Sequence, residues 1–155
     1  MSAIQLNRGY EAIVDAEDVA LVAQFNWTVL ETGGLCYARR TIRIGQRQKT
    51  ILLHRVIMKA KDGEFVDHIN GNGLDCRKEN MRIVTKSQNN INRKARPNRL
   101  GVPGVRKHSL CNKYTSDICV GNKRKYLGLF ETIEEASAAY QNAAEMYHGE
   151  FRRKA

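Results

Sequence analysis

The sequence predicts an α+β fold, and two stretches of the chain carry that prediction. Residues 65–93 read as a strand, an Asn/Gly turn, a second strand and a helix. Residues 104–149 read as three short strands followed by a helix with a small apolar face. The residues before 54 alternate in the manner of short strands. We therefore expect a ββα core, preceded by a small strand-rich region and followed by a three-stranded antiparallel sheet packed on one helix.

The N-terminal region, residues 1–53, has the alternating pattern of a small sheet. Asp15, Glu17 and Asp18 open a short helix, as the helix dipole favours. Trp27 is the single tryptophan of the chain, and we expect it in the hydrophobic core. The expected strands are 12–14, 27–30, 35–44 and 49–53, and the expected helix is 19–25.

The central stretch, residues 54–93, gathers polar side chains around one turn. After a short helix at 54–60, an apolar strand ends with Asp67 and His68 side by side. The sequence Asn-Gly-Asn-Gly at 70–73 supplies a turn, because Asn and Gly tolerate positive φ. A strand at 81–84 returns, and Thr85 caps a helix that carries Gln88, Asn89 and Asn90. A carboxylate, an imidazole and an amide are therefore expected near one end of this unit.

These three chemical groups suit phosphodiester hydrolysis. A divalent metal ion prefers oxygen ligands, which Asp67 and a helix amide from Asn89 or Asn90 can supply. The imidazole of His68 has an ordinary pKa of about 6.5, so it can accept a proton from water near neutral pH. Neighbouring strand residues point to opposite faces, so both side chains serve one site only if the strand ends there.

Residues 65–93 resemble the HNH nucleases, in particular the phage and intron homing-endonuclease branch with Asn in the third motif position. The matching pieces are Val-Asp-His-Ile-Asn-Gly-Asn, Glu-Asn-Met-Arg-Ile-Val-Thr and Gln-Asn-Asn. The resemblance implies that His68 is the general base and that Asn80 braces the loop between the strands. It also implies that Asp67 and Asn89, with Asn90 as the register alternative, bind Mg²⁺, or Mn²⁺ in its place. His54 lies in the segment 53–57 that precedes the motif, and a histidine there usually packs or contacts DNA in this family.

Positive charge is concentrated just after this motif. Between residues 80 and 116 the chain has nine Lys or Arg and no Asp or Glu. Such a run predicts a track of contacts to DNA phosphates. Residues 94–100 form a basic linker, since Pro97 excludes a regular strand or helix. The expected phosphate contacts are Arg93, Lys94, Arg96 and Arg99, and Arg39, Arg40 and Arg43 of the N-terminal region could add to them.

The last part of the chain, residues 101–155, is expected to be a separate small domain. Its strands are 104–107, 114–120 and 125–130. A capping box, Thr-Ile-Glu-Glu, opens the final helix at Thr132, and Gly149 ends it. The spacing of the apolar residues predicts that one face of this helix packs on the sheet. The expected buried residues are Ala136, Ala139, Tyr140, Ala143, Ala144 and Tyr147.

This domain resembles the Apetala/ethylene-response-factor (ERF) DNA-binding domain. The matching pieces are Gly-Val-Arg, Tyr-Leu-Gly-Leu-Phe, Thr-Ile-Glu-Glu-Ala-Ser-Ala-Ala-Tyr and His-Gly-Glu. Family members lay the sheet in the major groove. The resemblance therefore implies that DNA is faced by Arg106, His108, Tyr114, Arg124 and Tyr126. Tyr114 and Tyr126 stand where Trp is usual, and Cys119 stands where Arg is usual, so the plant family's base preference does not transfer.

Composition narrows the class of protein. The formal net charge of +10 over 155 residues is a nucleic-acid signal that ribosomal and membrane-surface proteins share. The two resemblances imply that the partner is double-stranded DNA, and no obligate protein partner is evident. No stretch approaches the ~20 apolar residues that span a membrane, and the N-terminus lacks the pattern of a signal peptide. The four cysteines have no metal-binding spacing and are expected to be reduced thiols. The expected location is the cytoplasm of a bacterium or a phage-infected host.

The sequence leaves two alternatives to a site-preferring endonuclease. One is a sequence-specific DNA-binding protein or regulator whose nuclease site is inactive. The other is a structural nucleoprotein, which would bind DNA with no preferred sequence. Cleavage of plasmid DNA in the presence of a divalent metal separates the nuclease from both alternatives.

Overall fold

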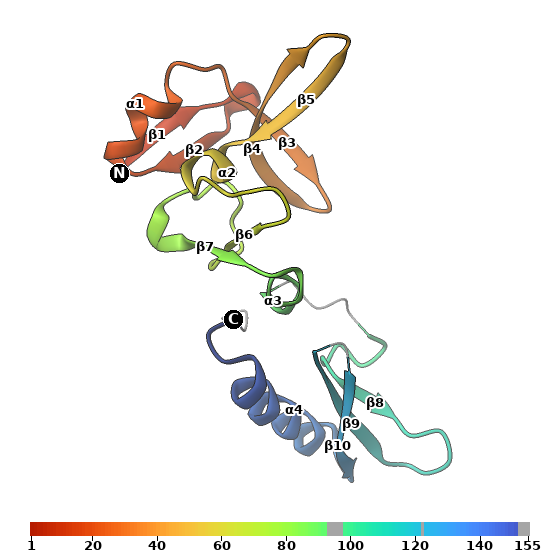
Figure 1. The fold of residues 1–155 in the computed structure, drawn as a ribbon. Helices are drawn as coiled ribbons and strands as arrows, with labels where there is room; N and C mark the ends of the chain where they lie inside the picture. Colours follow the sequence, from red (N-terminus) through yellow and green to blue (C-terminus); the bar gives the residue numbers. More distant parts are fainter. Residues whose placement is uncertain (93–97, 122, 152–155) are drawn as a thin grey trace. The chain divides into compact units, whose positions relative to one another are not determined.

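The computed structural model describes residues 1–92, 98–121 and 123–151 (Figure 1). The chain divides into two compact units, residues 1–89 and 90–155, and the boundary falls within the helix Lys86–Asn92. The architecture is mixed α and β, with four small antiparallel sheets and few helices among the described residues. The arginines and lysine expected at 93, 94 and 96, together with Pro97, lie outside the described residues.

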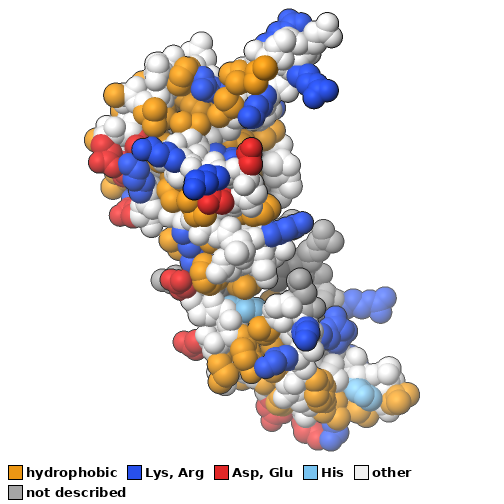
Figure 2. Space-filling view, in the orientation of Figure 1, with side chains coloured by type: hydrophobic (Ala, Val, Ile, Leu, Met, Phe, Trp, Pro, Cys, Tyr) orange, Lys and Arg blue, Asp and Glu red, His pale blue; other side chains and the backbone are white. Residues whose placement is uncertain are grey.

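The first unit begins with two small sheets. Strands β1 (Ser2–Gln5) and β2 (Glu11–Val14) form an antiparallel pair. The short helix α1 (Val19–Val22) leads to a three-stranded sheet in the order β3-β4-β5. Its strands are β3 (Thr28–Thr32), β4 (Leu35–Ile44) and β5 (Arg47–Leu52). Figure 2 shows Lys and Arg side chains at the exposed end of the β4–β5 hairpin.

The second half of this unit holds the stretch that the sequence singles out. Helix α2 (Leu53–Ile57) follows β5 directly. Strands β6 (Phe65–His68) and β7 (Met81–Val84) then pair antiparallel, and α3 (Lys86–Asn92) follows β7. The side chain of Thr85 accepts from the N–H of Gln88, and the Gln88 side chain accepts from the N–H of Thr85. This reciprocal cap starts α3 where the sequence predicts.

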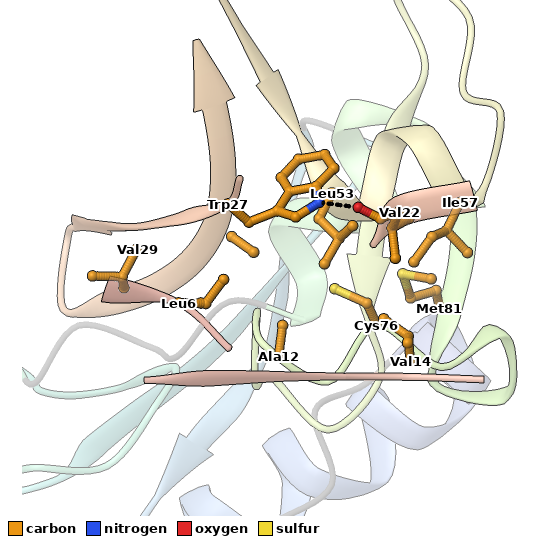
Figure 3. Packing of buried hydrophobic residues seen from close by; sticks show 11 residues of the cluster. Leu6, Ala12, Val14, Val22, Trp27, Val29, Leu53, Ile57, Cys76 and Met81 are labelled. Carbon is orange, nitrogen blue, oxygen red and sulfur yellow. Dashed lines mark hydrogen bonds between the residues drawn. The ribbon is translucent and has the colours of Figure 1, made fainter. Parts of the chain in front are cut away.

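One hydrophobic core connects these elements in the first unit (Figure 3). Trp27 lies in it, as expected, and its indole N–H donates to the carbonyl of Val22 at 2.9 Å. The amphipathic indole is therefore buried with its polar atom satisfied. The fully buried members include Val14 of β2, Leu53 of α2 and Cys76 of the loop between β6 and β7. Since these residues come from separate elements, the core fixes that loop against β2 and α2.

The second unit consists of a sheet and one long helix. Strands β8 (Val105–Lys107), β9 (Tyr114–Val120) and β10 (Lys123–Phe130) pair antiparallel with β9 in the middle. Helix α4 (Ile133–His148) packs on one face of the sheet, where Ile118 meets Ala143 and Ala144. The predicted capping box is present between Thr132 and Glu135. Such a cap stabilises a helix by about 1 kcal/mol.

Several element boundaries agree with the sequence, and others do not. The strands at 35–44, 81–84 and 114–120 have the predicted bounds. The expected helix at 19–25 stops at Val22, and the one at 54–60 stops at Ile57 with Lys59 at a positive φ of 50°. The predicted burial of Tyr147 is wrong, because its ring is 40% exposed under the ammonium of Lys125. Strand β1 was not expected.

The described part of the chain contains no helix that combines the length and the apolar character needed to cross a membrane.

Candidate functional site

The pairing of β6 with β7 places Asp67 and His68 at the end of a strand. Asp67 lies opposite Arg82, and His68 lies opposite Met81. The strand ends at His68, whose carbonyl accepts from the N–H of Gly71 as the chain turns with a φ of 73° at that glycine. Both side chains are buried. The turn therefore follows His68 immediately. Because the strand ends there, the side chains of Asp67 and His68 can serve one site, although neighbouring residues within a strand point to opposite faces.

The carboxylate of Asp67 is held by an arginine on the neighbouring strand. Its Oδ2 accepts from Arg82 Nε at 2.9 Å and from Nη2 at 2.8 Å. This contact forms because directly opposite residues on paired strands share a face. Arg82 was not among the predicted site residues, although its position two residues after Asn80 is part of the matched motif.

The imidazole of His68 lies against two other rings. The His54 ring, from α2, crosses it edge-on with centroids 5.0 Å apart, and the Tyr37 ring, from β4, lies 6.0 Å away. Burial lowers the pKa of His68, while the charges of Asp67 and Asp75 act in the opposite direction. The net lowering favours the neutral imidazole, which is the form that accepts a proton.

His54 is part of this ring cluster rather than a surface residue. Burial lowers its pKa to about 3, and the neighbouring His68 and Arg55 add to the effect. Its Nδ1 has no hydrogen-bond partner among the described residues. His54 therefore contributes a neutral, buried ring next to His68. Tyr37 was missed altogether, since it lies 31 positions before His68 and only tertiary packing brings it there.

Asn80 holds the loop between β6 and β7. Its amide nitrogen donates to the side chain of Asn70 at 3.0 Å and to the carbonyl of Asp75 at 2.8 Å. Its amide oxygen accepts from the N–H of Asn70 at 3.0 Å. This buried amide connects the start and the end of the loop. The loop is also tied to β2, because Ile13 exchanges backbone hydrogen bonds with Leu74 and Cys76.

Asp75 supports the same loop and was not predicted. Its carboxylate accepts from Arg77 at 2.7 and 2.8 Å and from the side chain of Asn70 at 2.9 Å. The hydrogen bond from Arg77 is the main cause of the lowered pKa of Asp75. The charge on Asp75 therefore persists at neutral pH a few residues from His68.

The helix amides occupy adjacent positions on α3. Asn89 is half-buried, with its N–H donating to the carbonyl of Thr85 at 3.0 Å, and Asn90 is exposed. Among the described residues, no three His, Cys, Asp or Glu side chains cluster as a metal site. The predicted ligand pair of one carboxylate and one amide has the oxygen donors that suit Mg²⁺.

In the second unit, the sheet face opposite α4 carries two of the predicted arginines. Residues 115, 117 and 119 of β9 alternate with Ser116 and Ile118, which are buried beneath α4. On this open face, Arg106 pairs with Thr115, Arg124 with Cys119 and Tyr126 with Asp117. Arg106, Arg124 and Tyr126 are all exposed.

The other predicted contacts in this unit have different surroundings. Tyr114 falls on the same side of β9 as Ser116 and Ile118, so it shares the face that α4 covers. His108 is half-buried in the β8–β9 hairpin, where its Nδ1 accepts from the N–H of Leu110 at 3.2 Å. Tyr114 and His108 are thus less exposed than Arg106, Arg124 and Tyr126, and their contacts with DNA stay predictions. Arg99 is exposed, as a phosphate contact requires.

Comparison with known proteins identifies the segment that contains Asp67 and His68. Residues 52–91 match the HNH endonuclease family. The site therefore lies in the segment that is similar to this family, which takes in α2, β6, β7 and Asn89. The whole chain is also distantly similar to an uncharacterized HNH endonuclease of Acanthamoeba polyphaga mimivirus, with 25% identity over 146 residues. That alignment covers 93% of this chain and 74% of the relative, so it extends into both units.

Proposed function

We propose that the protein is a metal-dependent DNA endonuclease of the homing type, which hydrolyses phosphodiester bonds at preferred sites by nicking or by double-strand cleavage. The observation that carries this proposal is the buried Asp67–His68 pair at the end of β6, inside the segment that matches the HNH endonucleases. The hydrogen bonds of Asn80 across the following loop support it, because they hold that strand end in place.

The donor set fits a hard divalent cation. Asp67 and Asn89 would hold Mg²⁺, or Mn²⁺ in its place, with oxygen ligands. When bound, the metal would stabilise negative charge on the phosphate as a Lewis acid. The ion pair with Arg82 engages Oδ2 of Asp67, so metal binding at that oxygen would require the contact to loosen.

His68 supplies the acid–base chemistry in this proposal. Its neutral imidazole takes a proton from the attacking water, the oxygen bonds to phosphorus, and the bond to the leaving oxygen of the DNA strand breaks. The rings of His54 and Tyr37 limit the orientations of the His68 imidazole. Asn80 acts by bracing the loop and has no direct part in the proton transfer.

The two units divide the work in this proposal. The 54–93 segment cuts, and the ERF-like domain at 101–155 provides affinity and much of the choice of site. The supporting observation is the open sheet face with Arg106, Arg124 and Tyr126 exposed together. Arg93, Lys94, Arg96 and Arg99, in and around the 94–100 linker, are proposed to contact phosphates.

Plasmid cleavage tests the proposed activity. The full chain should nick or linearise supercoiled plasmid with Mg²⁺ or Mn²⁺ and should stop in chelator. Asp67→Ala should abolish cleavage, and Asn89→Ala should weaken it and raise the metal concentration required, because few protein oxygens hold such an ion. Greater damage from Asn90→Ala would identify Asn90 as the ligand. Cleavage that persists in chelator would exclude the metal mechanism.

The second candidate is a sequence-specific DNA-binding protein or regulator with an inactive nuclease site. One observation favours it: Oδ2 of Asp67, one of the two possible ligand oxygens of this carboxylate, is already paired with Arg82 at 2.8 Å. This alternative predicts sequence-specific binding by a chain that leaves plasmid intact with every divalent metal tested.

A further inference from the structure

Asp117 occupies the centre of the open face of the second unit's sheet, between two arginines. Its Oδ1 accepts from Arg106 Nη2 at 2.8 Å, and its Oδ2 lies 3.3 Å from Arg124 Nε. Arg106 comes from β8 and Arg124 from β10, so one carboxylate on the middle strand joins both outer strands. We propose that Asp117 is a positioning residue that fixes both guanidinium groups for contact with base edges of double-stranded DNA.

The register of the sheet explains why these three side chains meet. Arg106 lies opposite Thr115, and Arg124 lies opposite Cys119. Asp117 lies two residues from both of these β9 positions, so it is the diagonal neighbour of each arginine on the same face. Tyr126 lies directly opposite Asp117. The sheet thereby arranges two cations and an exposed aromatic ring around one carboxylate.

Burial distinguishes Asp117 from its two partners. The Asp117 side chain is only 11% exposed, whereas those of Arg106 and Arg124 are 53% and 67% exposed. A carboxylate withdrawn from water requires partners, and the two guanidinium groups supply them. The arginines are therefore held through their guanidinium groups while much of each side chain remains exposed to solvent. The carboxylate also reduces the repulsion between two positive charges on one small surface.

The backbone of Asp117 is itself firmly placed. Its N–H donates to the carbonyl of Gly104 at 2.9 Å. A side chain at Gly104 would collide with the ring of Tyr140 from α4, so a glycine is needed for this close packing. The carboxylate therefore projects from a strand that is fixed both by the sheet and by the helix behind it.

The unused hydrogen-bond donors of the arginines suit recognition of bases. A guanidinium has five N–H donors, and Arg106 uses only its Nη2 group toward Asp117. The remaining donors can pair with guanine O6 and N7, the commonest specific contact in the major groove. A cavity of about 320 Å³ lined in part by Arg106, Asp117, Cys119 and Arg124 adjoins them. Orienting two long, flexible side chains in advance lowers the entropic cost of making such contacts.

This inference rests on the proposed DNA-reading role of the second unit, and one experiment tests the two separately. Full-length chains would be used to select sites from a library of double-stranded DNA with a randomised segment. We expect the wild type to enrich a motif. Asp117→Asn should reduce the preference at the guanine positions about tenfold, in line with the loss of one well-oriented arginine–base contact. Asp117→Glu, which keeps the carboxylate, should restore part of that preference.

Glu131→Gln is the matched control. Glu131 is paired with Lys113 in the same unit, so this change also raises the net charge by one and also breaks an ion pair. It should tighten binding to all sequences slightly and leave the motif unchanged. If Asp117→Asn acts only by raising the net charge, both variants will change the selected motif to the same extent. That result would overturn the proposal.

A double-mutant comparison separates positioning from direct contact. In a chain that carries Arg106→Ala and Arg124→Ala, Asp117→Asn should have no further effect on base preference. A further loss in that background would overturn the proposal, since Asp117 would then act without the arginines. A motif that Asp117→Asn leaves intact would overturn only this inference. A wild-type chain that enriches no motif would overturn the DNA-reading role and this inference together.

Discussion

His68 is the residue on which the proposed cleavage chemistry depends most directly. It is buried, its ring touches those of His54 and Tyr37, and burial lowers its pKa. An imidazole in this setting is neutral at pH 7 and ready to accept a proton. A buried ring in contact with two others also contributes to packing. The effect of replacing His68 must therefore be measured both on the cleavage rate and on the affinity for DNA.

His68→Ala should reduce the cleavage rate about 10²–10⁴-fold, which is the usual contribution of a positioned general base. DNA affinity should stay close to that of the wild type, because the side chain is buried. Nicking rates and binding curves on the same plasmid would measure both quantities. His148→Ala, at the end of α4 in the other unit, is the control and should cleave normally. Full activity of the His68 variant would remove His68 from the mechanism.

The buried His54 predicts how stability depends on pH. Its pKa of about 3 in the folded protein lies below the ordinary value of 6.5, so the unfolded chain binds the proton more readily between these values. Its contribution to stability is complete above about pH 6.5 and falls as the pH decreases, by roughly 1.4 kcal/mol per pH unit. The lowered pKa of His68 acts in the same direction.

The free energy of unfolding of the first unit should therefore fall by about 2 kcal/mol between about pH 7 and pH 5 through His54 alone. Urea titrations followed by the fluorescence of Trp27, the single tryptophan, report on this unit. His54→Leu should have a smaller pH slope, whatever its absolute stability. Equal slopes for the two proteins would show that His54 titrates normally in the folded state.

At the scale of elements, the loop between β6 and β7 is fitted closely against β4. A Cβ at Gly73 would lie 2.6 Å from the ring atoms of Tyr37 and would also meet the carbonyl oxygen of Cys36. Gly73 does not have a positive φ, so its lack of a side chain serves close packing rather than backbone geometry. Because Tyr37 also contacts His68, this packing links the loop to the proposed site.

Gly73→Ala should destabilise the first unit by about 1–3 kcal/mol, the usual cost of overpacking. It should also slow cleavage, because the displaced Tyr37 ring no longer supports His68. Gly45→Ala in the β4–β5 turn provides the comparison, since its φ is +60° and a Cβ there meets nothing within 4 Å. That variant should lose stability without a specific loss of activity. Equal activity in the two variants would show that the Tyr37 contact does not matter for cleavage.

At the scale of the whole molecule, the chain has two compact units, to which we have assigned the proposed roles of cutting and reading. The first unit contains Asp67 and His68, and the second contains the Arg106–Asp117–Arg124 group. The net charge of +10 implies that phosphate contacts supply much of the affinity, so binding should weaken steeply as salt increases.

A fragment of residues 1–93 retains all of α3 and should keep the cutting chemistry while losing most of the choice of site. Cleavage maps of the fragment and the full chain on the same long DNA would show this directly. Circular dichroism must first show that the fragment is folded. If the maps of a folded fragment and the full chain agree, the site preference resides in the first unit.

Elements with strong local signals could be predicted from the order of the residues alone. Strands 81–84 and 114–120 have clear boundaries, and the caps at Thr85 and Thr132 are local hydrogen-bond patterns that a few neighbouring residues specify. The sequence also indicated the HNH segment, because Asp67, His68 and Asn80 lie within one short stretch whose order and spacing match the family. Such features depend on residues close together in the chain.

Contacts between residues far apart in the chain could not be predicted in this way, because they depend on how the elements pack. Tyr37 and His54 reach His68 from β4 and α2, and no local pattern reports a contact between rings on separate elements. The register of β9 places Asp117 between Arg106 and Arg124, while Tyr114 alternates with them on the side of the strand that carries Ser116 and Ile118. A shift of one residue in that register would exchange the two faces, so the open face follows from strand pairing and from the packing of α4.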